Sequence, residues 1–129
     1  MIPVNFKKEF SGTLDKAIQE VTTALQKQGF GILTRIDFHT KIKEKLGKEV
    51  PPTVILGACH PPMAYQAYQA NSDFTSLMPC NAVIRQVGAD RFSIEFTSAE
   101  ALATLIPEPE ARQFGLEIDK KFAAALEQI

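Results

Sequence analysis

The sequence has few cysteines, no long apolar stretch and no excess of charge of one sign. Its two cysteines lie 21 positions apart, without CxxC or zinc-ribbon spacing, which excludes a disulfide scaffold. The longest apolar run, at 54–59, has about six residues, whereas a membrane span needs about 20. Residues 1–10 also lack the apolar core of a secretory signal. We therefore expect a cytoplasmic protein with reduced thiols and no membrane contact.

Charge and composition exclude further classes of protein. The chain of 129 residues has 14 basic and 15 acidic residues, a net charge of −1 and a pI near 6.1. A general nucleic-acid binder is usually more basic, and the lysines at 41–48 have no aromatic residues between them, so no nucleic-acid partner is expected. With 45% apolar and 22% charged residues, the chain is neither collagen-like nor disordered. Its length predicts a single domain over residues 1–129.

Periodicity and breakers predict a mixed order of strands and helices. Thr13 is a candidate N-cap for a first helix, and Gly29 suits the position after its end. Asp37 can cap a second helix, which Gly47 closes. In the terminal helix, Gly115 costs about 1 kcal/mol relative to Ala and weakens the prediction of an unbroken helix. The predicted strands cover 4–10, 30–37, 53–60, 81–87 and 91–97, and the helices 14–25, 38–46, 62–70, 98–105 and 111–129.

In this order, β-α-β-α-β-α-β-β-α-α, the last two strands form a hairpin. It predicts the α+β class, with helices packed on one face of a mainly antiparallel sheet. A nucleotide-binding fold is disfavoured, because no G-x-G-x-x-G follows a strand and no Walker sequence is present.

Three motifs resemble those of the domain of unknown function 302 family. They are GFGILTRID at 29–37, GACHP at 57–61 and LMPCN at 77–81, in that order and covering nearly the whole chain. His60 departs from the pattern, because the family usually has asparagine there. The resemblance implies a compact domain similar to TATA-box-binding-protein-like folds, often dimeric and without an established activity.

The last two motifs also supply the candidate site residues. Cys59 and His60 precede a helix that opens at Pro62, where free backbone N–H groups favour negative charge. Cys80 and Asn81 begin a later strand, and Arg85 shares one strand face with Asn81 and could bind an anion. The simplest alternatives are that both cysteines are buried apolar residues and that Arg85 pairs with Glu95 across the hairpin.

Two other chemistries remain open for the same residues. Cys59 and Cys80 could act in a thiol redox enzyme or sensor if one thiol has a low pKa. A metal or haem could bind through His60, although neighbouring residues on an extended chain point to opposite faces. Neither a Ser-His-Asp nor a Cys-His-Asn set can be assembled, so no catalytic residue, metal ligand or cofactor is assigned.

The favoured interpretation is therefore a binding domain rather than an enzyme. We expect a small ligand or anion to bind near the turns at 59–62 and 79–81. These turns share one sheet edge if their strands are antiparallel, which the predicted sheet favours. The nine phenylalanines and the long apolar terminal helix also predict a homodimer.

Overall fold

The computed structural model describes residues 3–129 and contains one five-stranded sheet in the order β1-β5-β4-β3-β2. All neighbouring strands are antiparallel, which confirms the predicted sheet. The α+β class and the succession of strands and α-helices are also as predicted. The strands are β1 (Asn5–Ser11), β2 (Gly31–Asp37), β3 (Thr53–Cys59), β4 (Cys80–Gly88) and β5 (Arg91–Thr97).

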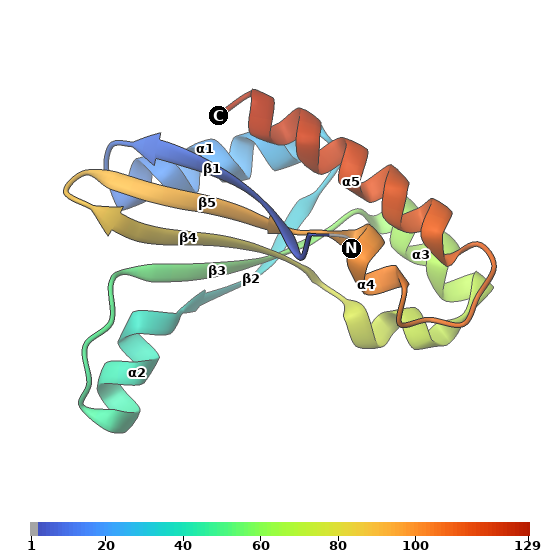
Figure 1. The fold of residues 1–129 in the computed structure, drawn as a ribbon, viewed down its shortest axis with the longest axis horizontal. Helices are drawn as coiled ribbons and strands as arrows, with labels where there is room; N and C mark the ends of the chain where they lie inside the picture. The colour runs from blue at the N-terminus through green and yellow to red at the C-terminus, as the bar shows by residue number, and fades with distance from the viewer. Residues whose placement is uncertain (1–2) are drawn as a thin grey trace.

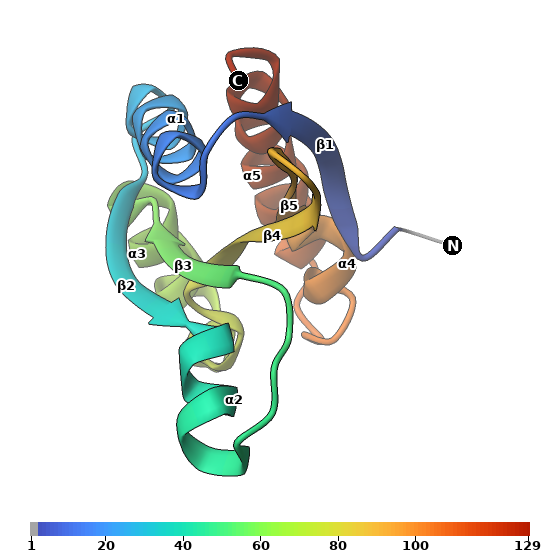
Figure 2. The same cartoon turned by 90° about the vertical axis from the view of Figure 1, so that its left-hand side faces the viewer.

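Two long helices, α1 (Leu14–Lys27) and α5 (Ala111–Glu127), cover the same face of the sheet (Figure 1; Figure 2). Strand alternation directs every second side chain toward these helices, and the main core lies between the two layers. Its largest fully buried side chains are Phe96, Phe122, Leu25, Leu56, Ile84, Ile94, Val21 and Val54.

The ends of α1 follow the sequence prediction. The Thr13 hydroxyl accepts a hydrogen bond from the N–H of Lys16, and Gly29 has a φ of 88° in the chain that leaves the helix. Gly115, in contrast, does not interrupt α5. It is buried against the short helix α4 (Ala99–Ala103), and a Cβ there would lie 2.6 Å from the Cα of Glu100. The missing side chain therefore serves close helix packing, not a break.

The remaining helices stand at the two ends of the sheet (Figure 1). At one end, α2 (Phe38–Leu46) projects from the body after β2. At the other end, α3 (Pro61–Ala70) follows β3 and leads into a 3₁₀ helix, η1 (Ser72–Leu77), that the sequence did not reveal. Asp37 occupies the N-cap of α2, but its carboxylate binds Arg35 instead of capping the helix.

The second face of the sheet carries a polar network in place of long helices. Arg85 forms an ion pair with Glu95, and Glu95 also accepts a hydrogen bond of 2.9 Å from the hydroxyl of Ser93. This pairing explains how the carboxylate of Glu95 can be only 6% exposed. Within residues 3–129, no helix is long and apolar enough to cross a membrane.

Candidate functional site

The register of β3 and β4 brings the two motif turns together. Ala58 pairs with Cys80, and Gly57 pairs with Asn81. Antiparallel partners are about 5 Å apart and consecutive Cα atoms 3.8 Å, so the Cα atoms of Cys59 and Cys80 lie within about 9 Å of each other. The predicted closeness of the two turns is thus confirmed.

A cavity of about 90 Å³ opens beside this strand pair. It is lined by residues from the ends of β3 and β4 and from α3, η1, α4 and α5. Figure 1 shows α3 and α4 at this end of the sheet. Three of the predicted residues, Cys59, His60 and Cys80, line it. The other lining residues are uncharged and mostly small or apolar: Ala58, Met63, Ala64, Ala67, Phe74, Leu77, Met78, Pro79, Ala99, Leu102, Ala103, Phe114, Gly115 and Ile118.

One wall of the cavity is fixed by the contact between α4 and α5. Gly115 allows the helix backbones to approach closely, as described above. One helical turn later, the buried carboxylate of Asp119 accepts hydrogen bonds from the hydroxyl of Ser98 at 2.8 Å and from the N–H groups of Ala99 at 2.7 Å and Glu100 at 3.2 Å. Asp119 therefore satisfies the free N–H groups at the start of α4 and holds this short helix in place.

His60 is held at the entrance to α3 as its N-cap. Its Nδ1 accepts a hydrogen bond of 3.4 Å from the N–H of Met63, and its ring lies edge-on to Phe30 with centroids 5.4 Å apart. A Cβ on Gly29 would lie 2.9 Å from Nε2, so the glycine leaves room for the ring. Burial and the nearby Lys121 lower the pKa of His60, against a smaller opposing effect of a backbone hydrogen bond. His60 thus acts mainly as a neutral helix cap.

Both cysteines are free thiols in an environment that disfavours ionisation. Burial raises the pKa of Cys59. Burial, followed by the charges of Cys59 and Asp119, raises the pKa of Cys80 to about 12. A nucleophilic thiol needs the opposite shift, so these surroundings do not favour the redox alternative.

Three predicted residues, Pro62, Asn81 and Arg85, do not line the cavity. Asn81 and Arg85 point to the opposite face of the sheet, because side chains alternate along β4 and the side chain of Cys80 faces the helices. The guanidinium of Arg85 is engaged by Glu95, as the alternative interpretation expected. Pro62 is exposed in the first turn of α3. The anion site that combined Arg85 with the cysteines is therefore not assembled.

Most of the cavity wall was missed by sequence reasoning. Leu102 and Phe114 lie far along the chain from both motifs, and only the packing of α4 on α5 brings them to the site. The available signals were Gly115 within an apolar stripe and the small residues Ala64 and Ala67 on one face of α3. Each indicates close packing rather than a ligand site.

The comparisons with known proteins agree with the fold. A crystal structure of the uncharacterized conserved protein DUF302 from Bacillus stearothermophilus matches with a TM-score of 0.90 and 24% identity over 98% of each chain. No curated protein matches the sequence significantly. The family described as Domain of unknown function DUF302 matches residues 6–129, nearly the whole chain. The protein therefore belongs to the DUF302 family.

Proposed function

We propose that the protein binds a small uncharged ligand, or the uncharged end of a larger one, in the cavity beside Cys59 and Cys80. The observation that carries this proposal is that, among the described residues 3–129, no Asp, Glu, Lys or Arg lines the cavity. A buried ionic group of a ligand would find no partner of opposite charge there, and such burial is costly. The proposal keeps the small ligand predicted from the sequence and drops the anion.

The size of the cavity limits the enclosed part of the ligand. An apolar protein cavity of about 150 Å³ can stay dry and bind benzene. At about 90 Å³, this cavity has room for roughly four non-hydrogen atoms. His60 and the two thiols are the polar or weakly polar groups of the wall, and they suit a ligand with at most one weak hydrogen-bonding group.

The test is a titration with two probes of equal length and different charge. Chemical shifts of the protein amides are followed while 1-butanol or butyrate is added at pH 7. We expect shifts at residues of α3, α4 and β4 with butanol, and binding by butyrate at least about tenfold weaker, because its carboxylate must lose water without gaining a partner. Equal binding of both probes, or shifts spread over the whole surface, would contradict the proposal.

A pair of variants ties the signal to the cavity. Ala67 is 6% exposed and lines the cavity, so Ala67→Leu should fill it and abolish butanol binding. Ala123 lies on the exposed side of α5, and Ala123→Leu adds the same atoms away from the cavity. This control should bind butanol like the parent protein. If Ala67→Leu folds and binds butanol unchanged, the ligand site lies elsewhere.

A further inference from the structure

The end of β2 and the helix α2 that follows it expose apolar side chains. Nine large apolar or aromatic side chains are exposed within residues 3–129, and three of them lie close together in the sequence. These three form the α2 patch: Ile36, Phe38 and Leu46, with exposed fractions of 44%, 38% and 64%. α2 has no buried residue and projects from the body of the protein (Figure 1; Figure 2). Exposed apolar patches often mark a contact with a protein or a membrane.

The sequence of α2 is that of an amphipathic helix with basic flanks. Its apolar residues recur at every fourth position and therefore lie on one side of the helix: Phe38, Ile42 and Leu46. Ile42 is half-buried, whereas the residues at the two ends of this stripe are exposed. At about 3.6 residues per turn, lysines lie on both flanks of the stripe, Lys41 and Lys45 on one and Lys43 on the other. Glu44 lies on the opposite side of the helix.

Positive charge is concentrated in the same segment. Residues 38–49 contain four lysines and two glutamates, a net charge of +2 within a chain whose net charge is −1. Two of the lysines form ion pairs with the two glutamates: Lys41 with Glu44, and Lys43 with Glu49. All four of these side chains are more than half exposed, and exposed pairs contribute little. The other two lysines have no ion-pair partner among residues 3–129.

Charge and apolar area together identify the partner that fits the α2 patch. A second copy that bound through the same patch would place its lysines against these lysines, and like charges repel. A nucleic acid would attract the lysines but leave the apolar side chains in water. An anionic bilayer accepts both groups. Apolar side chains enter the boundary between headgroups and acyl chains, and the lysine ammonium groups reach the phosphates.

We propose that the α2 patch binds the surface of a membrane that contains anionic phospholipids. The inference goes beyond the proposed function, because it involves neither the cavity nor its ligand. The sequence prediction of no membrane contact rested on the lack of a membrane-spanning segment. Binding at a membrane surface does not require such a segment, because an amphipathic helix lies in the plane of the headgroups.

The test is co-sedimentation of the full-length protein with sucrose-loaded vesicles. One set of vesicles is phosphatidylcholine alone, and the other contains equal amounts of phosphatidylcholine and phosphatidylglycerol. We expect the partition coefficient to be at least about tenfold higher on the anionic vesicles, because each lysine near such a surface contributes to binding. Raising the salt concentration from about 0.05 M to about 0.5 M should remove most of this preference by screening.

A pair of leucine variants tests the apolar part of the α2 patch. Leu46→Ser should lower the partition coefficient on anionic vesicles by at least about fivefold, because it removes an apolar side chain that leaves water on binding. The matched control is Leu105→Ser, since Leu105 is 67% exposed and follows α4 at the other end of the sheet (Figure 1). The control should bind within about twofold of the parent protein. Both leucines are exposed, so both variants are expected to fold.

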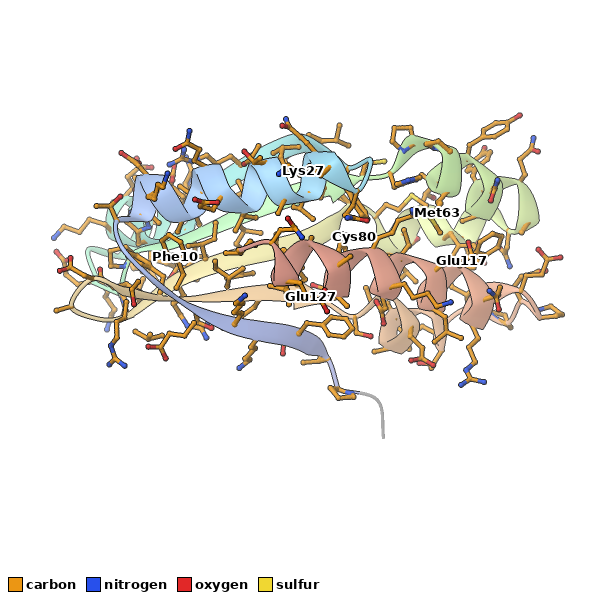
Figure 3. All side chains as sticks on the ribbon, turned by 90° about the horizontal axis from the view of Figure 1, so that it is seen from above. Phe10, Lys27, Met63, Cys80, Glu117 and Glu127 are labelled. Carbon is orange, nitrogen blue, oxygen red and sulfur yellow. The ribbon has the colours of Figure 1, made fainter. Side chains whose placement is uncertain are left out.

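A pair of lysine variants tests the charge. Lys41→Gln with Lys45→Gln should lower the partition coefficient on anionic vesicles by about tenfold. The control, Lys27→Gln with Lys120→Gln, removes the same charge from exposed positions of α1 and α5. Figure 3 shows Lys27 on α1, in the helix layer that covers the sheet. This control should bind within about threefold of the parent protein, because charges far from the membrane are screened.

The proposal is overturned if the parent protein binds both kinds of vesicle equally, or binds neither. It is also overturned if Leu46→Ser binds as tightly as the parent, because the lysines alone would then attract any polyanion. Light scattering tests the second copy as the occupant. A parent protein of about twice the chain mass of 14.2 kDa that Leu46→Ser, but not Leu105→Ser, converts to a monomer would assign the patch to a second copy. That result, without vesicle binding, would contradict the membrane site and leave the ligand of the cavity unaffected.

Discussion

The two ends of the sheet carry helices of similar length with opposite degrees of burial. At one end, α2 has no buried residue, and Phe38 and Leu46 are 38% and 64% exposed. At the other end, α3 buries Met63 and Ala67 among η1, α4 and α5. The difference lies in the elements that contact each helix. α2 is linked to β3 by the hydrogen bond from the N–H of Thr53 to Nδ1 of His39. α3, in contrast, packs against other helices.

This contrast shows that, of the two ends of the sheet, the cavity end holds the more deeply buried side chains. A second small core lies there, formed by Ala67, Phe74, Ala103 and Ala111. Segments with few buried apolar contacts open at low free-energy cost. We therefore expect substitutions to destabilise the protein strongly at the cavity end and weakly at α2.

The largest effect is expected for Asp119→Ala. This substitution removes the acceptor for the Ser98 hydroxyl and for two backbone N–H groups of α4, at a cost of about 2–4 kcal/mol in the free energy of unfolding. Urea unfolding followed by circular dichroism measures it. Glu117→Ala, on the exposed side of the same helix, should change the free energy of unfolding by less than about 0.5 kcal/mol. Similar values for the two variants would show that Asp119 does not hold α4.

Next in size is Gly115→Ala. Its new Cβ would meet the α4 backbone at 2.6 Å, so α4 and α5 must move apart, which should cost about 1–3 kcal/mol. The matched control is Gly31→Ala, because a Cβ at Gly31 would have no neighbour within 4 Å among residues 3–129. We expect the control to leave the unfolding midpoint unchanged within error. An equal loss of stability in both variants would argue against a packing role for Gly115.

A smaller effect concerns the pH dependence of stability. The pKa of His60 is lowered in the folded protein by burial and Lys121, so the unfolded chain binds a proton more readily. The contribution of His60 is fully present above its unfolded pKa of about 6.5 and is lost as the pH falls through the lower folded value. His60→Asn keeps an effective N-cap without a titrating ring. The free energy of unfolding of this variant should therefore fall less between pH 7 and pH 5 than that of the parent protein. An equal fall in both proteins would exclude His60 as the cause.

The smallest effect on stability is expected at α2. Leu46→Ser should change the free energy of unfolding by no more than about 0.5 kcal/mol, because Leu46 is already exposed. The homodimer stays a prediction, motivated by the apolar terminal helix and the nine phenylalanines of the sequence. Light scattering of the parent protein near 14.2 kDa at micromolar concentration would refute it.

Much of the fold could be predicted because local signals and topology agreed. Thr13 caps α1 through a hydrogen bond whose partners are three residues apart, and β5 alternates Phe92, Ile94 and Phe96 toward the core. The closeness of Cys59 and Cys80 followed from the antiparallel arrangement of their strands. These features depend on short sequence distances or on strand direction.

The site was predicted only in part, since its composition depends on contacts between distant segments. The pairing of Gly115 with Glu100 and the capping of α4 by Asp119 are set by tertiary packing. Asn81 could have been separated from Cys80 by the alternation rule alone, because neighbours in a strand point to opposite faces. The sequence prediction grouped them because they share a motif, and a shared motif does not imply a shared face.

The most direct test of the apolar cavity is a crystal structure determined under xenon pressure. Xenon binds in dry apolar cavities, where there are no hydrogen-bonding groups that would favour water instead. We expect one xenon atom in the cavity between Met63, Cys80 and Ile118, and no xenon there in the Ala67→Leu variant. Ordered water hydrogen-bonded within the cavity, with no xenon bound, would contradict a site for an uncharged ligand.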